Sequence, residues 1–534
     1  MPVGRYFILA LFLCVGSPCL AQDLRTVVEP KLPPVCVSLG AEISATKGEI
    51  DDNAEKRLDT RRIQAAIDSC KPGTSVQLQG NVDGNAFLTG PLELKTGITL
   101  LVAQNTTLFG SRNPRDYDTS PGSCGVVDQN GRGCKPMISA RKAPGAGVMG
   151  DGAIDGRGGA TLIGQKATWW DLAQKAKVDN ARQNVPRIIV TDQSDDFTLY
   201  RITLRNSPNF HVLVNRANGF TAWGVKIDSP KTARNTDGID PSSSTNVSIL
   251  YCYIRCGDDN VAIKAGTAGP ATHMTIAHNH FYSGHGMSIG SETDGGASEI
   301  EVRDLTIDGA DNGLRIKSNT TRGGLVHNVL YSNVCIRDVK NPILMDPFYS
   351  TERGPKPPDF RDIQLHNVFI ATPGKITLLG LDAQHPLKVT MDGVHAAGVR
   401  AGDVRAAHAH IVVGAGGSNV KPSGEDVDVS EIPGSKDRPV VCGGEFVPFP
   451  AAAAGHVGEA VPSSVVRNIQ ESTSTTVTVA PDGSGDYDPV QQAIESLPGS
   501  GALVRIRPGV YREVVGWKPS PRQLAGPLLR IEPK

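Results

Sequence analysis

The sequence has few aromatic residues (5%), almost no net charge and no long apolar run beyond its first residues. Lys and Arg total 54 against 55 for Asp and Glu, a formal net charge of -1, so the charge balance favours no nucleic-acid partner. Past residue 21, no segment approaches the 18 apolar residues of a membrane span, so we expect no membrane contact in the mature chain. Hydrophobic residues (39%) still suffice for a large core.

The cysteines form no CxxC pair, and no histidine lies at zinc-finger spacing beside them. We therefore expect neither a metal nor a cofactor. An even number of cysteines follows residue 21, which is typical of disulfide bonding outside the cytoplasm. We expect a bridge between Cys124 and Cys134 across a glycine-rich loop, with Cys36 and Cys70 as a second candidate pair.

Residues 1–21 read MPVGRYFILALFLCVGSPCLA. One Arg precedes an apolar run from Tyr6 to Val15, and small or turn-forming residues follow it to Ala21. This pattern predicts a signal peptide and hence a secreted protein, against the alternative of a buried first helix.

Similar β-branched runs recur along the middle of the chain at Phe197, Phe220, Val247, Met274 and Ile300, at intervals of 23, 27, 27 and 26 residues. Such regular self-similarity is typical of a solenoid, in which each repeat buries its apolar face against its neighbours. Because the runs alternate apolar and polar residues, we predict an all-β fold, a right-handed parallel β-helix, with a β-sandwich as the alternative.

The first coil of such a solenoid needs a cap over its unpaired strand edge. The segment DTRRIQAAIDSC predicts a short N-terminal capping helix, with Asp59 or Thr60 as its N-cap and an apolar stripe of Ile63, Ala66 and Ile67. We therefore place a lead-in over residues 22–58 and the β-helix over 59–445. An Ala-, Pro- and Ser-rich stretch predicts a linker over 446–475, and residues 476–534 look like the opening of a second β-helix.

Stacked coils lie about 4.8 Å apart, so residues at equal offsets from the repeat starts become neighbours. Asp258 follows Val247 by 11 residues, and His285 follows Met274 by the same number. Asp237 falls in the matching turn of the preceding coil. One side of the solenoid should therefore gather the carboxylates Asp237, Asp258 and Asp259 around His285.

Cations follow the same rule. Lys264 and Lys317 each lie 17 residues after a repeat start, and Arg315 precedes Lys317 on the same strand face. Taken singly, these residues would be turn formers or solvated surface charges. Together they favour glycoside hydrolysis, in which one carboxyl protonates the leaving oxygen and another activates water. The cations would bind a carboxylated sugar chain.

Four motifs occur in order along these coils: NTDG at Asn235–Gly238, GDD at Gly257–Asp259, GHG at Gly284–Gly286 and RIK at Arg315–Lys317. With them, the chain from about Asp59 to about Val399 resembles the polygalacturonases of glycoside hydrolase family 28, and most of all the bacterial endo-acting members.

The resemblance implies a monomer that hydrolyses polygalacturonate, the backbone of pectin, with inversion. Asp258 would be the general acid, assisted by His285, while Asp237 and Asp259 would activate water. The substrate-binding residues implied are Arg315, Lys317, Asn235 and, on a looser motif, Tyr349, for which a packed tyrosine is the alternative.

The tail has a resemblance of its own. VAPDGSGDYDPVQQAIESLP and RIRPGVYREVV are similar to the first coil of a pectin methylesterase, but the rest of such an enzyme is missing, so we expect no esterase activity. For the main domain three alternatives stay open: an exo-acting polygalacturonase, a calcium-dependent pectate lyase and a non-catalytic β-helix.

Overall fold

A computed structural model describes residues 22–436, 442 and 446–450, together with three short strands nearer the C-terminus. The chain divides into two compact units, residues 1–453 and 454–534. In the second unit, strands β38 (Thr475–Val479), β39 (Ala502–Ile506) and β40 (Arg530–Pro533) pair in parallel in that order. The expected signal peptide and most of the expected linker and esterase-like tail lie outside the described residues.

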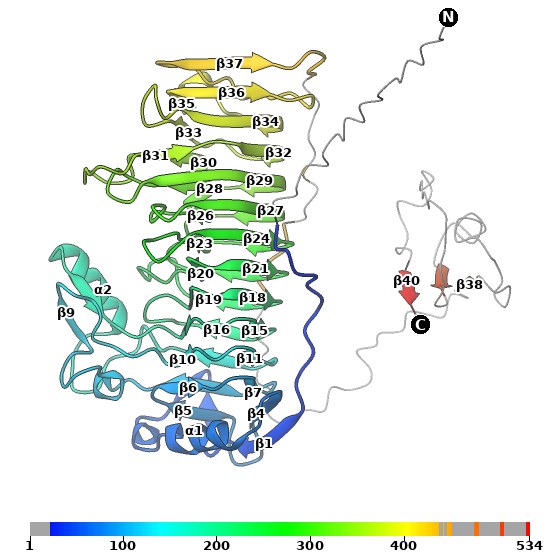
Figure 1. Cartoon of the computed structure of the whole chain (residues 1–534). Helices are drawn as coiled ribbons and strands as arrows, with labels where there is room; N and C mark the ends of the chain where they lie inside the picture. The colour runs from blue at the N-terminus through cyan, green and yellow to red at the C-terminus, as the bar shows by residue number, and fades with distance from the viewer. Residues whose placement is uncertain are drawn as a thin grey trace, which may run out of the picture. The chain divides into compact units, whose positions relative to one another are not determined.

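The first unit is a parallel β-helix, as predicted, with coils stacked from the blue N-terminal end to the yellow end of the described chain (Figure 1). An 11-stranded sheet forms one wall, here called the site sheet. Its strands are β6 (Leu92–Leu94), β10 (Ile138–Arg141), β14 (Ile189–Asp192), β17 (Val212–Asn215), β20 (Ile239–Ser242), β23 (Val261–Ile263), β26 (Met287–Ile289), β28 (Asn312–Lys317), β30 (Asn341–Asp346), β33 (Ile376–Leu379) and β35 (Val404–Ala407).

A 22-stranded sheet supplies the other walls. Its first row holds β1 (Val35–Gly40), β4 (Thr74–Gln79), β7 (Ile98–Val102), β11 (Gly147–Met149), β15 (Phe197–Tyr200), β18 (Asn218–Trp223), β21 (Thr245–Leu250), β24 (Ala271–Ala277), β27 (Ala297–Asp308), β29 (Gly324–Arg337), β32 (Ile363–Ile370), β34 (Leu387–Ala396), β36 (Ala409–Val413) and β37 (Val427–Glu431). Its second row holds β5 (Ala86–Thr89), β8 (Thr107–Gly110), β12 (Ala153–Asp155), β16 (Thr203–Arg205), β19 (Lys226–Asp228), β22 (Tyr253–Arg255) and β25 (His280–Phe281), and β31 (Pro358–Phe360) pairs with β29.

The strand register confirms the predicted repeat. Phe197 lies opposite Phe220, Phe220 opposite Val247, Val247 opposite Met274, and Met274 opposite Ile300. All five side chains are fully buried, and the two phenylalanine rings stack 6.4 Å apart. Burying such a side chain contributes about 1.5–3 kcal/mol each, so the inward ladder both fixes the register and holds the coils together.

The N-terminal cap is helix α1 (Thr60–Ser69), which buries Ile63, Ala66 and Ile67 as predicted. Two details differ from expectation. Asp59 precedes the helix but makes no side-chain capping bond; its carboxylate instead accepts the Leu88 N–H at 2.9 Å. The solenoid also begins earlier than residue 59, because β1 pairs in parallel with β4.

Both predicted disulfides are present, Cys36–Cys70 and Cys124–Cys134, and a third joins Cys335 to Cys442. The two remaining cysteines after residue 21, Cys252 and Cys256, are buried free thiols. These two flank strand β22, and four steps of about 3.3 Å along a strand separate them by about 13 Å, too far for a bridge.

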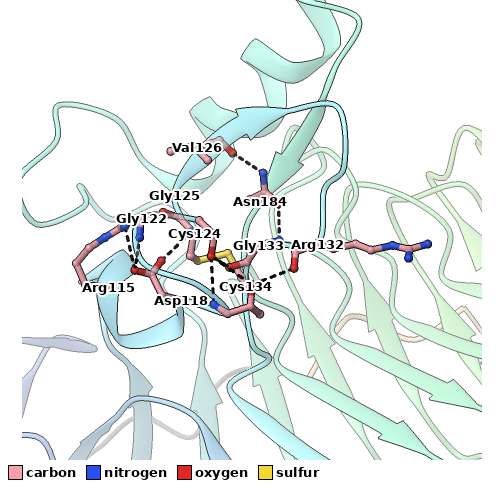
Figure 2. Close-up of a disulfide and its surroundings, with 12 residues drawn as sticks. Arg115, Asp118, Gly122, Cys124, Gly125, Val126, Arg132, Gly133, Cys134 and Asn184 are labelled. Carbon is pink, nitrogen blue, oxygen red and sulfur yellow. Dashed lines mark hydrogen bonds and ion pairs between the residues drawn. A yellow bond between two sulfur atoms is a disulfide. The ribbon is translucent and has the colours of Figure 1, made fainter.

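Two excursions leave the solenoid and pair with each other, as seen at the left of Figure 1. The first, between β8 and β10, carries β9 (Val126–Asp128), and the second, between β12 and β14, carries α2 (Trp169–Val178) and β13 (Arg182–Asn184). The Cys124–Cys134 disulfide closes the loop of the first excursion (Figure 2). Asn184 then ties β13 to this loop, because its carboxamide accepts the Gly133 N–H at 2.6 Å and donates to the Val126 carbonyl. These bonds hold β13 against the disulfide-closed loop, where it pairs with β9 in a separate two-stranded sheet.

The stretch expected to begin a linker at residue 446 starts with residues that pack on the solenoid. The Phe446 ring lies 4.3 Å from the Arg337 guanidinium, and the Phe449 ring lies 4.2 Å from that of Arg255. Among the described residues, no helix has the length and apolar character needed to cross a membrane.

Candidate active site

The candidate site lies on the site sheet at strands β20, β23, β26 and β28 and the turns that lead into them. Close stacking of these turns explains two of the motif glycines. A Cβ at Gly257 would lie 2.2 Å from the Ala233 carbonyl oxygen, and one at Gly286 would lie 2.2 Å from that of Asn312. Only glycine allows the backbone to approach so closely, and the flanking side chains are thereby brought onto one face.

Asp258 contacts His285 and Asn235. Its Oδ1 lies 3.1 Å from His285 Nδ1, which bears out the equal offsets of the two residues, and its Oδ2 accepts from Asn235 Nδ2 at 3.4 Å. Burial opposes ionisation of Asp258, but the hydrogen bond and charge of His285 outweigh it and lower the Asp258 pKa. Burial lowers the pKa of His285, but the hydrogen bond and the charge of Asp258 raise it by more. The pKa of His285 therefore lies above its usual value of 6.5. The two groups therefore form an ion pair.

The excursion that carries β13 contacts the candidate site at Asn235. Gln183, on β13, donates from Nε2 to Asn235 Oδ1 at 3.0 Å. Asn235 adopts a positive φ of 58°, a conformation that asparagine tolerates better than most residues. A carboxamide fixed at both ends thus sets the position of Asp258 from one side, while His285 sets it from the other.

Asp259 is bound by cations on both oxygens. Lys317 Nζ lies 2.6 Å from Oδ2, and Arg315 Nη1 lies 3.2 Å from Oδ1. Ser288 Oγ also donates to Oδ1 at 2.7 Å. The Asp259 and Lys317 side chains are 2% and 6% exposed, so this is a buried ion pair.

Asp237 lies deeper and has a weaker cation contact. Lys264 Nζ is 3.4 Å from Asp237 Oδ2 but 2.6 Å from Oδ2 of Asp240, a buried carboxylate on β20. Burial first, and then the neighbouring carboxylates Asp240 and Asp258, raise the pKa of Asp237 well above its usual value, while Lys264 opposes the rise. The three predicted aspartates therefore have three different electrostatic environments.

Tyr349 belongs to the same face. Its side chain is 45% exposed, which excludes the packed-tyrosine alternative, and its ring lies 5.6 Å from the Arg315 guanidinium and 5.2 Å from Lys317 Nζ. The aromatic ring and the guanidinium therefore lie beside each other, a pair that suits a planar, charged ligand.

Three residues around the site were not identified from the sequence: Asp240, Ser288 and Gln183. The first two lie on strands β20 and β26 and contact Lys264 and Asp259 respectively. Asp240 follows Asp237 by three residues, which was the available signal. Gln183 comes from a separate excursion, and no repeat spacing relates it to Asn235.

Asp258, Asp259 and His285 offer ligand atoms within 4.8 Å of one another, as do His408, Glu425 and Asp426 at the C-terminal end of the solenoid. The first group suits a cation poorly, because Lys317 and Arg315 already occupy both oxygens of Asp259. Calcium requires six to eight oxygen ligands, so we derive no chemistry through a metal here.

Crowded carboxylates with cations on the outer wall of a parallel β-helix define a polysaccharide hydrolase of the solenoid class. The sequence matches the model of the glycosyl hydrolases family 28 over residues 46–410. The chain belongs to that family and is a glycoside hydrolase, which confirms the resemblance found in the motifs.

Named relatives agree. An endo-polygalacturonase of Pectobacterium parmentieri is 45% identical over 387 residues, which cover 72% of this chain and 92% of that protein. A polygalacturonase of Ralstonia nicotianae is 40% identical over 523 residues, covering 84% of this chain and 98% of that protein. The solved polygalacturonase from Erwinia carotovora ssp. carotovora superposes with a TM-score of 0.66 at 41% identity, over 76% of this chain and 100% of that one.

Proposed function

We propose that the protein is an endo-polygalacturonase that hydrolyses α-1,4-galacturonosyl bonds inside homogalacturonan with inversion. The observation that carries the proposal is the meeting of Asp237, Asp258 and Asp259 on one face beside Arg315 and Lys317. The endo assignment is supported by the name of the Pectobacterium relative at 45% identity.

Asp258 is the general acid, and its proton is drawn from His285. In the free site the Asp258 carboxylate accepts a hydrogen bond from a histidine whose pKa is raised, so below that pKa the pair holds one proton in common. Asp258 is the more exposed of the three aspartates, with 18% of its side chain accessible. It can therefore pass the shared proton to the glycosidic oxygen, and His285 loses its charge as the bond breaks.

Asp237 and Asp259 activate the attacking water. Lys317 and Arg315 hold Asp259 in place through two ion pairs, and Asp259 orients the water by accepting a hydrogen bond from it. Asp237, with its raised pKa, is the stronger base and takes the proton from water. Each aspartate therefore has its own role, which is set by the residues that contact it.

Arg315 and Tyr349 bind the sugar next to the scissile bond. The Arg315 guanidinium spends one N–H on Asp259 and retains others for a galacturonate carboxylate. Lys317 is almost fully buried against Asp259, so its main role is to hold that carboxylate. This differs from the sequence-based expectation, which was direct binding of the substrate.

Export and a monomeric state are part of the proposal. The three disulfides support folding in an oxidising compartment. Size-exclusion chromatography with light scattering of the secreted protein tests the monomer.

Paired viscosity and reducing-end assays on polygalacturonate test the function. Internal cleavage predicts a rapid fall in viscosity with few new reducing ends, and inversion predicts β-anomeric products in early proton spectra. A slow fall in viscosity with many ends would show an exo-acting enzyme. Unsaturated, ultraviolet-absorbing products that disappear on chelation would show a lyase and overturn the proposal.

A further inference from the structure

A second group of charges lies behind Asp237, and the mechanism above does not use it. It consists of Lys264 just after β23, Asp240 on β20 and Arg187 just before β14, and the two cations lie against the ring of Phe210. Lys264 Nζ lies 4.2 Å from the Phe210 ring centre, and the Arg187 guanidinium lies 4.9 Å from it. Two cations thus flank one aromatic ring beside two buried carboxylates.

Lys264 joins the two carboxylates. Its Nζ contacts Asp240 at 2.6 Å and Asp237 at 3.4 Å, and its side chain is only 16% exposed. Burial disfavours its charge, but the charges of Asp240 and Asp237 outweigh burial and raise the Lys264 pKa. A single ammonium is therefore shared unequally between a carboxylate that faces the reaction and one that does not.

Asp240 is completely buried and competes for the same cation. Its Oδ1 and that of Asp237 meet no hydrogen-bond donor among the described residues. Burial, opposed by Lys264, raises the pKa of Asp240 to about 6. Arg187 offers the nearest additional positive charge, and its Nε also lacks a partner within the described part of the chain.

We propose that Lys264 and Asp240 are positioning residues that set the proton affinity of Asp237: Lys264 favours its carboxylate form and Asp240 opposes it. This inference rests on the proposed role of Asp237 as the base. It accounts for a fully buried carboxylate that has no task of its own in the reaction, since an opposite charge within about 4–6 Å shifts a pKa by one to three units.

Asp237 meets charges from every neighbouring coil. His211, on the preceding coil, contacts only its backbone oxygen, at 3.0 Å, and is itself buried with a lowered pKa of about 4. The charged side chains that act on the Asp237 carboxylate are Asp240, Asp258, Asp259, Lys264 and Arg187. Of these, Asp258 and Asp259 have their own cationic partners, and Arg187 makes no ion pair with Asp237 within the described part of the chain. Lys264 and Asp240 are therefore the adjustable pair.

The pH dependence of kcat/KM on polygalacturonate tests the inference, because its acid limb reports the pKa of the base in the free enzyme. Lys264→Met should move the acid limb to higher pH by about one unit or more, since Asp237 then protonates more readily. Asp240→Asn removes a competing charge with little change of shape, and it should move the same limb to lower pH. Two opposite shifts distinguish electrostatic tuning from a loss of structure, which would lower activity without moving either limb.

The double variant Lys264→Met with Asp240→Asn is a control for misfolding, because it removes both charges of one ion pair and leaves neither of them buried alone. Its acid limb should lie between those of the single variants. Lys264→Arg, which keeps the charge, should restore the wild-type limb. Circular dichroism and thermal melting of each variant establish that the solenoid is intact.

Two results would overturn the inference while leaving the hydrolase in place. One is an unmoved acid limb in folded single variants. The other is a raised KM with unchanged pH dependence for Lys264→Met, which would make Lys264 a substrate-binding cation. Failure of the proposed function is distinguishable from both, because the wild-type protein would then release no reducing ends from polygalacturonate.

Discussion

Replacing His285 by Gln separates the proton-sharing mechanism from a purely structural role for this histidine. Unit charges about 4 Å apart attract by about 4 kcal/mol at an effective dielectric of 20, and partial solvent access to His285 reduces that to about 2 kcal/mol. Removing this charge should therefore raise the pKa of Asp258. His285 Nδ1 lies 3.1 Å from Asp258 Oδ1, and its side chain is 31% exposed.

The sign follows from which group holds the proton. His285 is charged below its raised pKa and loses the proton as the pH rises through it, so the wild-type basic limb should lie above pH 6.5. In His285→Gln the proton must reside on Asp258 itself, a carboxyl, and the basic limb should move to lower pH by about one unit or more. Turnover should fall by about 10²-fold or more at the optimum, and further at neutral pH.

Initial rates of reducing-end release, followed across the pH range at several polygalacturonate concentrations, measure both effects, because kcat gives the turnover and the basic limb of kcat/KM reports the free site. His280→Gln is a matched control, since His280 contacts Thr306 on the other sheet, and both limbs should stay where they are. A lowered rate with an unmoved basic limb in His285→Gln would refute proton sharing.

Three further variants probe other parts of the account. Lys317→Met leaves the buried Asp259 with one cation, so urea denaturation should show a free energy of unfolding lower by about 3–5 kcal/mol, and turnover should fall at least tenfold. An unchanged free energy of unfolding would show that the pair is not buried in solution. Replacing Cys335 and Cys442 by Ser opens a loop of 107 residues, which should lower the free energy of unfolding by about 4–5 kcal/mol through chain entropy. The melting temperature should fall while activity stays full, and an equal melting temperature would show that the bridge does not form. Tyr349→Ala should raise KM for oligogalacturonates more than it lowers kcat, and a change confined to kcat would remove Tyr349 from the binding surface.

The repeat register could be predicted from the sequence because its cause is local. Each coil must place one large apolar residue inward, so the repeats that begin at Phe220, Val247 and Met274 align in the sequence. The strands pair at these same residues. Equal offsets from those starts then brought His285 to Asp258. Where coils have equal length, sequence interval converts directly into contact.

The rest of the site depends on how far side chains reach and on loops outside the repeat. Whether Lys264 binds Asp237 or Asp240 is decided by differences below 1 Å in the reach of one flexible side chain. Gln183 arrives on an excursion whose position depends on a disulfide and on Asn184. The Asp59 carboxylate likewise binds a neighbouring coil in place of its own helix.

Hydrolysis of polygalacturonate by the wild-type protein and by Asp258→Asn, compared side by side, tests the central claim most directly. The substitution keeps the shape of the side chain but cannot transfer a proton to the leaving oxygen. New reducing ends should appear with the wild-type protein, without ultraviolet-absorbing products, and their rate should fall by about 10³-fold or more in Asp258→Asn. Comparable rates in the two proteins, or unsaturated products from either one, would contradict the account.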